Sequence, residues 1–341
     1  VRSRGLGDVY KRQLLKCISM IEKKSREYEI EDVFRTYGVL TREAGFYFYF
    51  SRKIRELREC GHEGTARAYA SSLRSMQRYL GKKDFPFIKL SSRIISDYQG
   101  KLLASGICDN TIGFYLHNIK ALFRKGCREM GLELPCPFRD ISIKTEKTLK
   151  RSLDPVVIKT LSAIELEKDS PLSLARDIFM FSFYTRGMSF VDIALLKKRH
   201  VFPGEICYRR HKTDQLMRVG INKEISRILE RYKNVPGEYI FPLFPAERDP
   251  YAGYRSAYHR IRYSLGKISR VIGLEFPLRL HAARHSWATI AKVNGASVHV
   301  IGECLGHTSE KTTRIYLKEL DHSALDAVNN QVADFILAVD D

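Results

Sequence analysis

The sequence predicts a mostly α-helical protein of two domains, the second of which contains one small β-sheet. Three observations support this fold class. Apolar residues recur at helical spacing, with capping residues and glycines at the segment ends, through most of the 341 residues. Residues 204–210 and 216–221 instead alternate between apolar and polar side chains, as the two strands of a hairpin do. Residues 134–154 lie between the two helical regions and are proline-bounded, basic and without a helical period, which indicates a linker.

The composition indicates a polyanionic partner. Lysine and arginine total 58 against 39 acidic residues, a formal net charge of +19, and DNA is the leading candidate for such an excess. No apolar run is long enough to span a bilayer and no signal-peptide pattern is present, so the sequence predicts a cytoplasmic, nucleoid-associated protein without a membrane partner. The seven cysteines are dispersed without paired spacing, which argues for reduced thiols and against a zinc site.

The N-terminal part of the chain is predicted to hold an unassigned segment and then a four-helix domain. Residues 1–13 lack a helical period and are expected to be a disordered leader or foreign to the gene, and the remainder of 1–43 permits one short helix. The first domain comprises residues 44–133. Its predicted helices are 44–60, 64–81 with Thr65 as cap, 92–104, and a fourth that follows Asp109 or Asn110 as cap and extends to 131.

Basic side chains on these helices and on the linker are candidate contacts to DNA phosphates, which position a protein without specifying sequence. The alternative for the helices is an ordinary solvated face, and the alternative for the linker is an exposed tether. The candidates are Arg67, Arg74, Arg78, Lys120 and Arg124 on the helices, and Lys144, Lys147 and Lys150 on the linker.

The second domain, residues 155–320, is predicted to be helical on both sides of the hairpin, whose tip lies at or next to Lys212. The predicted helices before the C-terminal stretch cover residues 155–164, 172–184, 190–197, 224–232 and 251–272.

The most informative stretch is residues 279–318, which read RLHAARHSWATIAKVNGASVHVIGECLGHTSEKTTRIYLK. His281 and Arg284 are three residues apart in a segment of helical spacing, so they share one helical face. Gly295 is predicted to end that helix, and Ser297 can cap a second one. The sequence therefore places an imidazole and a guanidinium together near the start of a helical array.

The same stretch continues with a second imidazole and a phenol. Gly306 is predicted to end the second helix, and His307 follows it directly. Thr308 or Ser309 can cap a third short helix, which carries Tyr316 on its last turn. This array is expected to bring both imidazoles, the guanidinium and the phenol together.

A phenol opposite fixed cations suggests attack on a phosphodiester. Tyrosine has a pKa near 10 and is a poor nucleophile until a base or a positive field favours the phenolate. Arginine suits the negative charge that develops on phosphorus oxygens, because its planar fork donates two parallel hydrogen bonds and stays protonated. Singly, Tyr316 could be a core residue and His307 a satisfied surface residue, but their combination with Arg284 at these spacings favours the chemical interpretation.

HAARH, LGH and the tyrosine nine residues later resemble the C-terminal signature of the tyrosine recombinases, or lambda-integrase (phage integrase) family. The resemblance extends over residues 44–320, and the segment FSFYTRGMSFVDIALL is similar to the small integrases and DNA invertases of Bacteroidetes mobile elements. It implies a SAM-like core-binding domain over residues 44–133 and a catalytic tyrosine recombinase domain over residues 155–320. It also implies that Lys212 enters the minor groove and protonates the departing 5′-oxygen.

The resemblance implies a site-specific recombinase or integrase that forms a 3′-phosphotyrosyl intermediate at Tyr316. Arg284 would clamp the phosphate, His281 would accept a proton or donate a hydrogen bond, and His307 would support the phosphate. No metal, ATP or other cofactor is expected. The implied partners are double-stranded recombination sites and three further copies of the chain in a tetramer on DNA, and accessory proteins are compatible with this.

One position departs from the family pattern. The first catalytic arginine normally lies three residues before an acidic residue, here Asp192, but this position holds Ser189. Arg186 lies three residues earlier and would reach the same phosphate if one helical turn separated it from Ser189. Arg210 is the second candidate, since it lies two residues before Lys212 and would point to the same side of a strand. The sequence places Arg186 slightly ahead of Arg210.

The last segment, residues 321–341, contains five aspartates and no lysine or arginine, and its apolar residues would line one helical face. It is expected to pack on its own domain or on a neighbouring protomer.

Two other functions fit parts of the sequence. A type IB topoisomerase shares the chemistry but does not exchange partner strands. A catalytically impaired DNA-binding regulator would explain the serine at position 189.

Overall fold

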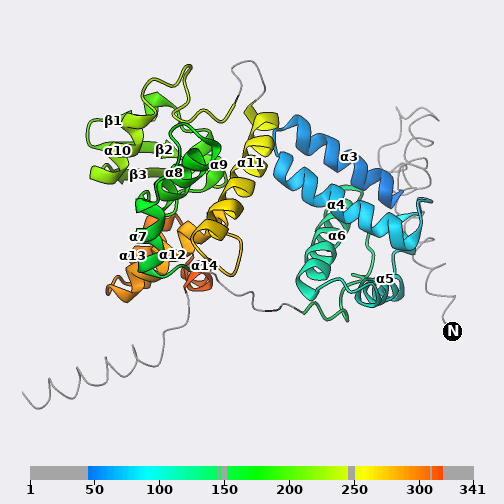
Figure 1. Ribbon diagram of the computed structural model, residues 1–341. Helices are drawn as coiled ribbons and strands as arrows, with labels where there is room; N and C mark the ends of the chain where they lie inside the picture. The colour runs from blue at the N-terminus through cyan, green and yellow to red at the C-terminus, as the bar shows by residue number, and fades with distance from the viewer. Residues whose placement is uncertain (1–44, 145, 147–151, 245–249, 308, 318–341) are drawn as a thin grey trace, which may run out of the picture. The chain divides into compact units, whose positions relative to one another are not determined.

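The computed structural model describes residues 45–144, 146, 152–244, 250–307 and 309–317, with the side chains of 250–252 and 315–316 left out (Figure 1). The predicted segments 1–43 and 321–341 and the linker residues Lys147 and Lys150 lie outside these residues. The chain divides into two compact units, Val1–Thr148 and Leu149–Asp341. The division falls inside the segment predicted to be a linker. No described helix is both long enough and apolar enough to cross a membrane.

The described residues of unit 1 form four α-helices and a short 3₁₀ helix. These are α3 (Phe46–Glu59), α4 (Glu63–Leu80), η1 (Phe87–Lys89), α5 (Ser92–Ala104) and α6 (Asp109–Glu129). All four predicted helices are therefore present, and α5 has the predicted bounds. Gly81 follows α4 with a φ of +94°, a conformation that favours glycine, so the helix stops where predicted.

The predicted caps of α4 and α6 are wrong. The structure starts α4 two residues before Thr65 and α6 at Asp109, so His62 and Cys108 occupy the N-cap positions and neither side chain makes a cap hydrogen bond. Tertiary packing decides these helix starts, because apolar residues of the first turns, such as Ala66 and Ile112, are buried in the core of unit 1.

The start of α3 is held by an acid from a distant loop. Asp84 accepts hydrogen bonds from the backbone N–H groups of Tyr47 at 2.8 Å and Phe48 at 2.9 Å. A carboxylate is favourable there because the first turn of a helix has unpaired N–H groups and the positive end of the helix dipole. Gly45 leaves room for this contact, since a Cβ at that position would lie 2.2 Å from Asp84 Oδ2.

The first half of the predicted linker packs on unit 1. Phe138 is buried in the core, and Ile141 and Ile143 pack against it. Asn110 and Glu146 exchange side-chain-to-backbone hydrogen bonds of 3.0 and 3.1 Å. Residues 134–144 and 146 are thus anchored to unit 1 although they form no helix, because apolar side chains among them pack in its core.

Unit 2 is built around α8 (Pro171–Tyr184), which packs against α7 (Pro155–Ala163), α10 (Lys223–Arg231), α11 (Pro250–Val271) and α12 (Leu280–Val293) (Figure 1). Apolar residues on all sides of α8 are fully buried, including Ile178, Phe179 and Phe181. A helix that is apolar around its whole circumference is expected to lie at the centre of a domain. The other helices in the described part of unit 2 are α9 (Phe190–Ala194), η2 (Lys198–His200), α13 (Val298–Leu305) and α14 (Glu310–Tyr316).

The small sheet has three antiparallel strands in the order β1 (Val201–Phe202), β2 (Glu205–Arg209) and β3 (Leu216–Gly220). Tyr208 pairs with Met217, so the hairpin has the register expected from its alternation. Two predictions were incomplete. Strand β1 was not predicted because two residues carry no periodicity, and α9 ends at Ala194 instead of residue 197, where the chain turns into η2.

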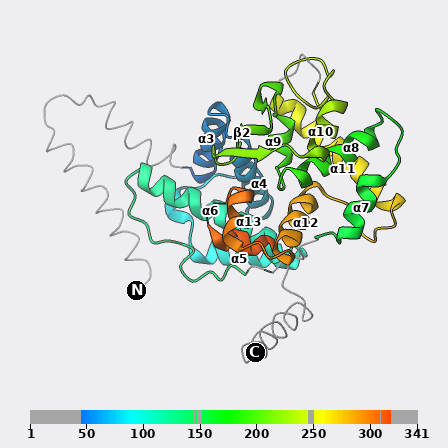
Figure 2. The ribbon, with the colours of Figure 1, turned by 90° about the vertical axis from the view of Figure 1, so that its left-hand side faces the viewer.

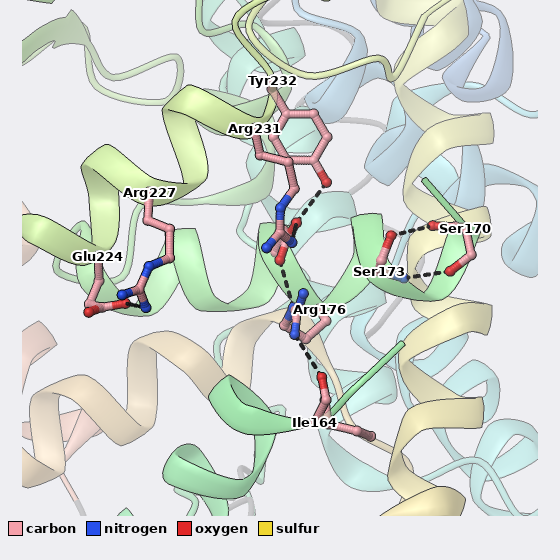
Figure 3. A network of polar contacts seen from close by, with 9 residues as sticks. Ile164, Ser170, Ser173, Arg176, Glu224, Arg227, Arg231 and Tyr232 are labelled. Carbon is pink, nitrogen blue, oxygen red and sulfur yellow. Dashed lines mark hydrogen bonds and ion pairs between the residues drawn. The ribbon is translucent and has the colours of Figure 1, made fainter. Parts of the chain in front are cut away.

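A buried polar network ties α10 to α8. Asp177 of α8 accepts hydrogen bonds from Arg176 Nε at 2.6 Å, Arg231 Nη1 at 2.5 Å and the Tyr232 hydroxyl at 2.9 Å. Arg176 also donates to the Ile164 carbonyl at 2.9 Å, just after α7. Figure 3 shows Arg231 and Tyr232 reaching down from α10 toward Arg176. The Asp177 carboxylate is 3 % exposed, so this network joins three segments of the domain within its core.

Candidate active site

Arg284 on α12 is the buried centre of the site. It is 4 % exposed, and its guanidinium donates to the Gly187 carbonyl at 2.8 Å and to the Leu305 carbonyl. Gly187 permits this approach, because its φ is +74° and a Cβ there would lie 2.5 Å from Arg284 Cγ. Arg284 thereby joins the turn after α8, its own helix and the end of α13.

His307 lies directly beside Arg284. Gly306 ends α13 in the left-handed conformation with a φ of +63°, as predicted, and Ser297 caps the helix by accepting from the Val300 N–H at 3.2 Å. His307 Nε2 lies 3.0 Å from Arg284 Nη2. Burial and then the charge of Arg284 lower the pKa of His307 to about 4, so its imidazole is neutral at physiological pH.

The other side of the His307 ring contacts the helix that bears Tyr316. His307 Nδ1 lies 3.0 Å from the hydroxyl of Thr313, which is fully buried on α14. Tyr316 is the last residue of α14, as predicted, and its side chain lies outside the described residues. Ser309 occupies the N-cap position of α14 without a side-chain cap hydrogen bond, and Thr308 lies outside the described residues. Both α12 and α13 pack against α14, and α12 and α13 lie side by side in Figures 1 and 2.

His281 lies one turn before Arg284 on α12, as predicted, and is exposed. Its ring packs edge-on against His285 with 4.8 Å between ring centroids. His281 and Arg284 both line a cavity of about 200 Å³, and Ser189, Tyr254 and Tyr258 line it as well. The cavity thus lies where the family pattern would place the first arginine.

Arg210, and not Arg186, contacts the segment that carries His307. Arg210 Nη1 donates to the carbonyl of Gly306, and the Arg210 charge contributes to the lowered pKa of His307. Arg186 instead points its Nη1 at the Arg218 carbonyl of β3, at 3.5 Å.

The helical turn predicted between Arg186 and Ser189 is absent. Helix α8 ends at Tyr184 and α9 begins at Phe190, and Arg186 itself has a φ of +59°. No helical turn therefore connects Arg186 to Ser189, and the chain at Gly187 bends to meet Arg284. Arg210, and not Arg186, thus contacts the segment that carries His307, although the sequence placed Arg186 slightly ahead.

Tyr208 on β2 shows how closely the cations gather. Burial and then Asp192 raise the pKa of Tyr208, whereas the positive charges of three arginines act in the opposite direction. These arginines are Arg210, Arg284 and Arg186. The charges of all three guanidiniums thus act on one buried ring, which lies near the loop end of the β2–β3 hairpin.

Asp192 holds the hairpin tip, a role that the sequence did not indicate. The hydroxyl of Ser189 donates to Asp192 Oδ2 at 2.6 Å, and the backbone N–H of His211 donates to Asp192 Oδ1 at 2.8 Å. Lys212 follows His211 and is exposed, and its charge also lowers the pKa of His307. The serine at position 189 is thus a helix cap and a partner of the acid that positions the Lys212 turn.

The candidate DNA contacts of unit 1 differ in exposure. Arg74, Arg78, Arg124 and Lys144 are exposed, whereas Lys120 is half-buried. Arg67 is also half-buried and pairs with Glu63 at 2.7 Å. Among the described residues, no group of three His, Cys, Asp or Glu side chains is arranged to hold a metal ion.

Two family models match the chain. Residues 152–322 match the phage integrase family, and residues 45–138 match the phage integrase SAM-like domain. Among curated proteins, the chain is 26 % identical over 226 residues to tyrosine recombinase XerC of Shewanella oneidensis, covering 63 % of this chain and 70 % of that protein. It is 24 % identical over 262 residues to tyrosine recombinase XerD of Pseudomonas putida, covering 74 % and 86 %.

Solved structures share the fold at low sequence identity. A lambda integrase (75–356) dimer bound to a COC′ core site has a TM-score of 0.59 at 18 % identity, covering 79 % of this chain and 93 % of that one. The Tn1549 transposon integrase in complex with transposon right end DNA has a TM-score of 0.61 at 14 % identity, covering 85 % and 99 %. With half of its residues matched by the family model and the SAM-like domain preceding them, the chain belongs to the phage integrase family of tyrosine recombinases.

Proposed function

We propose that the protein is a site-specific recombinase that cleaves and rejoins DNA through a 3′-phosphotyrosyl intermediate. The observation that carries this proposal is the convergence of Arg284 and His307, from consecutive helical segments, with Arg210 from the distant hairpin. His307 also forms a hydrogen bond with the helix that ends in Tyr316. Tyr316 attacks the scissile phosphorus, a P–O bond forms to its phenolic oxygen, and the bond to the 5′-oxygen breaks.

The surrounding side chains stabilise the charge that develops in this step. Arg284 and Arg210 donate to the non-bridging oxygens, which carry more negative charge in the five-coordinate transition state. Lys212 protonates the departing 5′-oxygen, because an alkoxide is a poor leaving group. His281, exposed on the same face as Arg284, accepts the phenolic proton or donates to the phosphate.

The reaction needs neither ATP nor a divalent metal under this proposal, because the phosphotyrosyl ester retains the energy of the broken phosphodiester. Two rounds of strand exchange in a tetramer would complete recombination. A lambda integrase tetramer bound to a Holliday junction shares this fold with a TM-score of 0.57 at 16 % identity. The exposed basic residues of unit 1, Arg74, Arg78 and Arg124, would contact the phosphates of the recombination site.

The proposed function is tested by trapping the covalent protein–DNA adduct on a pool of duplexes of many sequences. The full chain is incubated in EDTA, without ATP, with a pool of random-sequence duplexes. Each duplex carries a nick that lets the freed 5′-hydroxyl fragment diffuse away. We expect wild-type protein to give adducts that survive denaturant and enrich one sequence, and Tyr316→Phe to give none, because it lacks the nucleophilic oxygen.

The same capture separates the alternatives. Non-covalent enrichment of a sequence by both proteins, with no adduct, would identify a DNA-binding regulator and refute the recombinase. Two copies of a captured site on one plasmid then report the outcome of cleavage. Exchange of the flanking segments supports recombination, whereas relaxation of supercoils without exchange supports a type IB topoisomerase.

Arg210 and Arg186 are expected to differ in their effect on cleavage. We expect Arg210→Ala to slow adduct formation on a captured site by about 100-fold or more, the loss typical of one donor to a developing oxyanion. Arg186→Ala is expected to change the rate by less than about tenfold, because its guanidinium contacts the Arg218 carbonyl and not the Gly306 segment.

Arg209→Ala is the matched control for this comparison. Arg209 is adjacent to Arg210 and pairs with the exposed Asp214, so its removal tests the loss of one positive charge from the hairpin. Its rate should stay close to that of wild type. A larger loss from Arg186→Ala than from Arg210→Ala would return the role of the first arginine to Arg186.

A further inference from the structure

His307 is held at both of its ring nitrogens, and this arrangement specifies its tautomer. Nε2 lies 3.0 Å from Arg284 Nη2, and Nδ1 lies 3.0 Å from the Thr313 hydroxyl. A guanidinium nitrogen can donate a hydrogen bond but cannot accept one, so His307 Nε2 must accept. A neutral imidazole has one N–H, which is therefore on Nδ1 and donates to Thr313 Oγ1.

This tautomer cannot donate to a phosphate from Nε2. A non-bridging phosphate oxygen accepts hydrogen bonds, and in the DNA-free protein His307 Nε2 presents a lone pair next to Arg284. When a phosphate oxygen replaces His307 Nε2 as the acceptor of the hydrogen bond from Arg284, Nε2 must carry a proton to donate a hydrogen bond to the phosphate as well. The imidazole then gains a proton at Nε2 and loses one at Nδ1, each by exchange with solvent, and its net charge is unchanged.

This change of tautomer reverses the hydrogen-bonding role of the group that faces His307 Nδ1. With the proton on Nδ1 this group must accept a hydrogen bond, and with the proton on Nε2 it must donate one. A hydroxyl can do both by rotating its O–H bond. Thr313 is fully buried, so its hydroxyl, and not bulk water, is the standing hydrogen-bond partner of His307 Nδ1.

We propose that Thr313 is a positioning residue whose hydroxyl lets His307 change from the Nδ1–H tautomer in the free protein to the Nε2–H tautomer on DNA. This inference rests on the proposed function, because it assigns His307 as a donor to the scissile phosphate. Through Thr313, the tautomer of His307 is coupled to α14, the helix that ends in Tyr316.

The packing around Thr313 supports a specific role for its hydroxyl. Gly302 of α13 faces it, and a Cβ at Gly302 would lie 2.8 Å from Thr313 Oγ1, so the close approach of the two helices depends on this glycine. Thr313 and Tyr316 are three residues apart on α14, so they share one helical face. His307 therefore contacts α14 on the helical face that also carries Tyr316.

The tautomer is measured by ¹⁵N–¹H long-range correlation spectra of full-length protein labelled at histidine nitrogens, with His307→Gln for assignment. We expect the Nδ1–H pattern in the free wild-type protein and the Nε2–H pattern when the Tyr316→Phe protein is bound to a captured, uncleaved site. An Nε2–H pattern in the free protein, or no change on DNA, would overturn the proposal.

Variants at position 313 test the functional consequence. Thr313→Val keeps the shape but removes the hydroxyl, and we expect about 100-fold slower adduct formation, comparable to the loss of one donor to the phosphate. Thr313→Ser restores the hydroxyl and should restore the rate to within about tenfold. Thr312→Val is the matched control, because Thr312 is the exposed neighbour on the same helix.

The outcomes separate this inference from the proposed function. If wild type forms no adduct, the proposed function fails. If wild type forms adducts and Thr313→Val forms them equally fast, only the role of Thr313 fails. Circular dichroism of each variant checks that it is folded, and should Thr313→Val unfold, the wild-type spectra and the Thr313→Ser rate still decide the question.

Discussion

Replacing Arg284 with alanine is expected to reduce the rate of covalent adduct formation by about 1,000-fold or more, at the upper end of the loss seen for one electrostatic donor. The loss has two sources. The guanidinium supplies the buried positive charge nearest to His307, and it also holds the carbonyls of Gly187 and Leu305 that shape the site. The measurement is the single-turnover rate on a captured nicked site at saturating protein.

The variant Arg284→Lys separates the effect of the positive charge from the effect of the planar guanidinium. A lysine retains the charge but cannot span the two carbonyls and a phosphate, because its ammonium is a point donor and not a planar fork. Its rate should lie closer to that of Arg284→Ala than to wild type. An Arg284→Ala protein that cleaves within about tenfold of wild type would contradict the assignment of Arg284 as the central phosphate ligand.

Replacing Asp177 with alanine is expected to destabilise unit 2 by about 3–5 kcal/mol, as is typical when one partner of a buried ion pair is removed. The carboxylate satisfies Arg176, Arg231 and the hydroxyl of Tyr232, and the Arg176 side chain is only 12 % exposed (Figure 3). Alanine leaves Arg176 and the Tyr232 hydroxyl without this acceptor in the core, whereas the Arg231 side chain is 36 % exposed and can reach water. Urea unfolding followed by circular dichroism measures the loss as an earlier transition.

Glu224→Ala provides the control within the same region of the molecule. Glu224 pairs with Arg227 at 2.9 Å on the surface of α10, and both side chains are more than a third exposed (Figure 3). Exposed pairs contribute about 0–1 kcal/mol, so this variant should unfold near the wild-type urea concentration. Equal unfolding midpoints for Asp177→Ala and Glu224→Ala would show that the buried network does not stabilise the domain.

Much of the fold followed from local rules. The spacing of apolar residues identified the helices of both units, and Gly81, Gly295 and Gly306 ended helices where predicted because each has a positive φ. Local rules failed at the starts of α4 and α6, where burial of the first turn outweighed the capping preference of Thr65 and of Asp109 or Asn110. Capping is worth about 1 kcal/mol, which core packing readily exceeds.

Local sequence rules likewise determined only part of the candidate site. The sequence by itself determined the order and spacing of His281, Arg284, His307 and Tyr316, because helix periodicity and capping act within a few residues. Their convergence on a phosphate, and the roles of Arg210 and Lys212, remain predictions for the experiments above.

Only the tertiary structure decided which other residues meet this array. Arg210 and Gly306 are 96 positions apart in the chain, and Asp192 reaches the N–H of a residue 19 positions away. The contact of Thr313 with His307 depends on the close packing of α13 against α14 at Gly302. Neither helical periodicity nor a capping preference in the sequence indicates such contacts. A hydrogen bond depends on distance in space, and that distance is set only when the helices and the hairpin pack together.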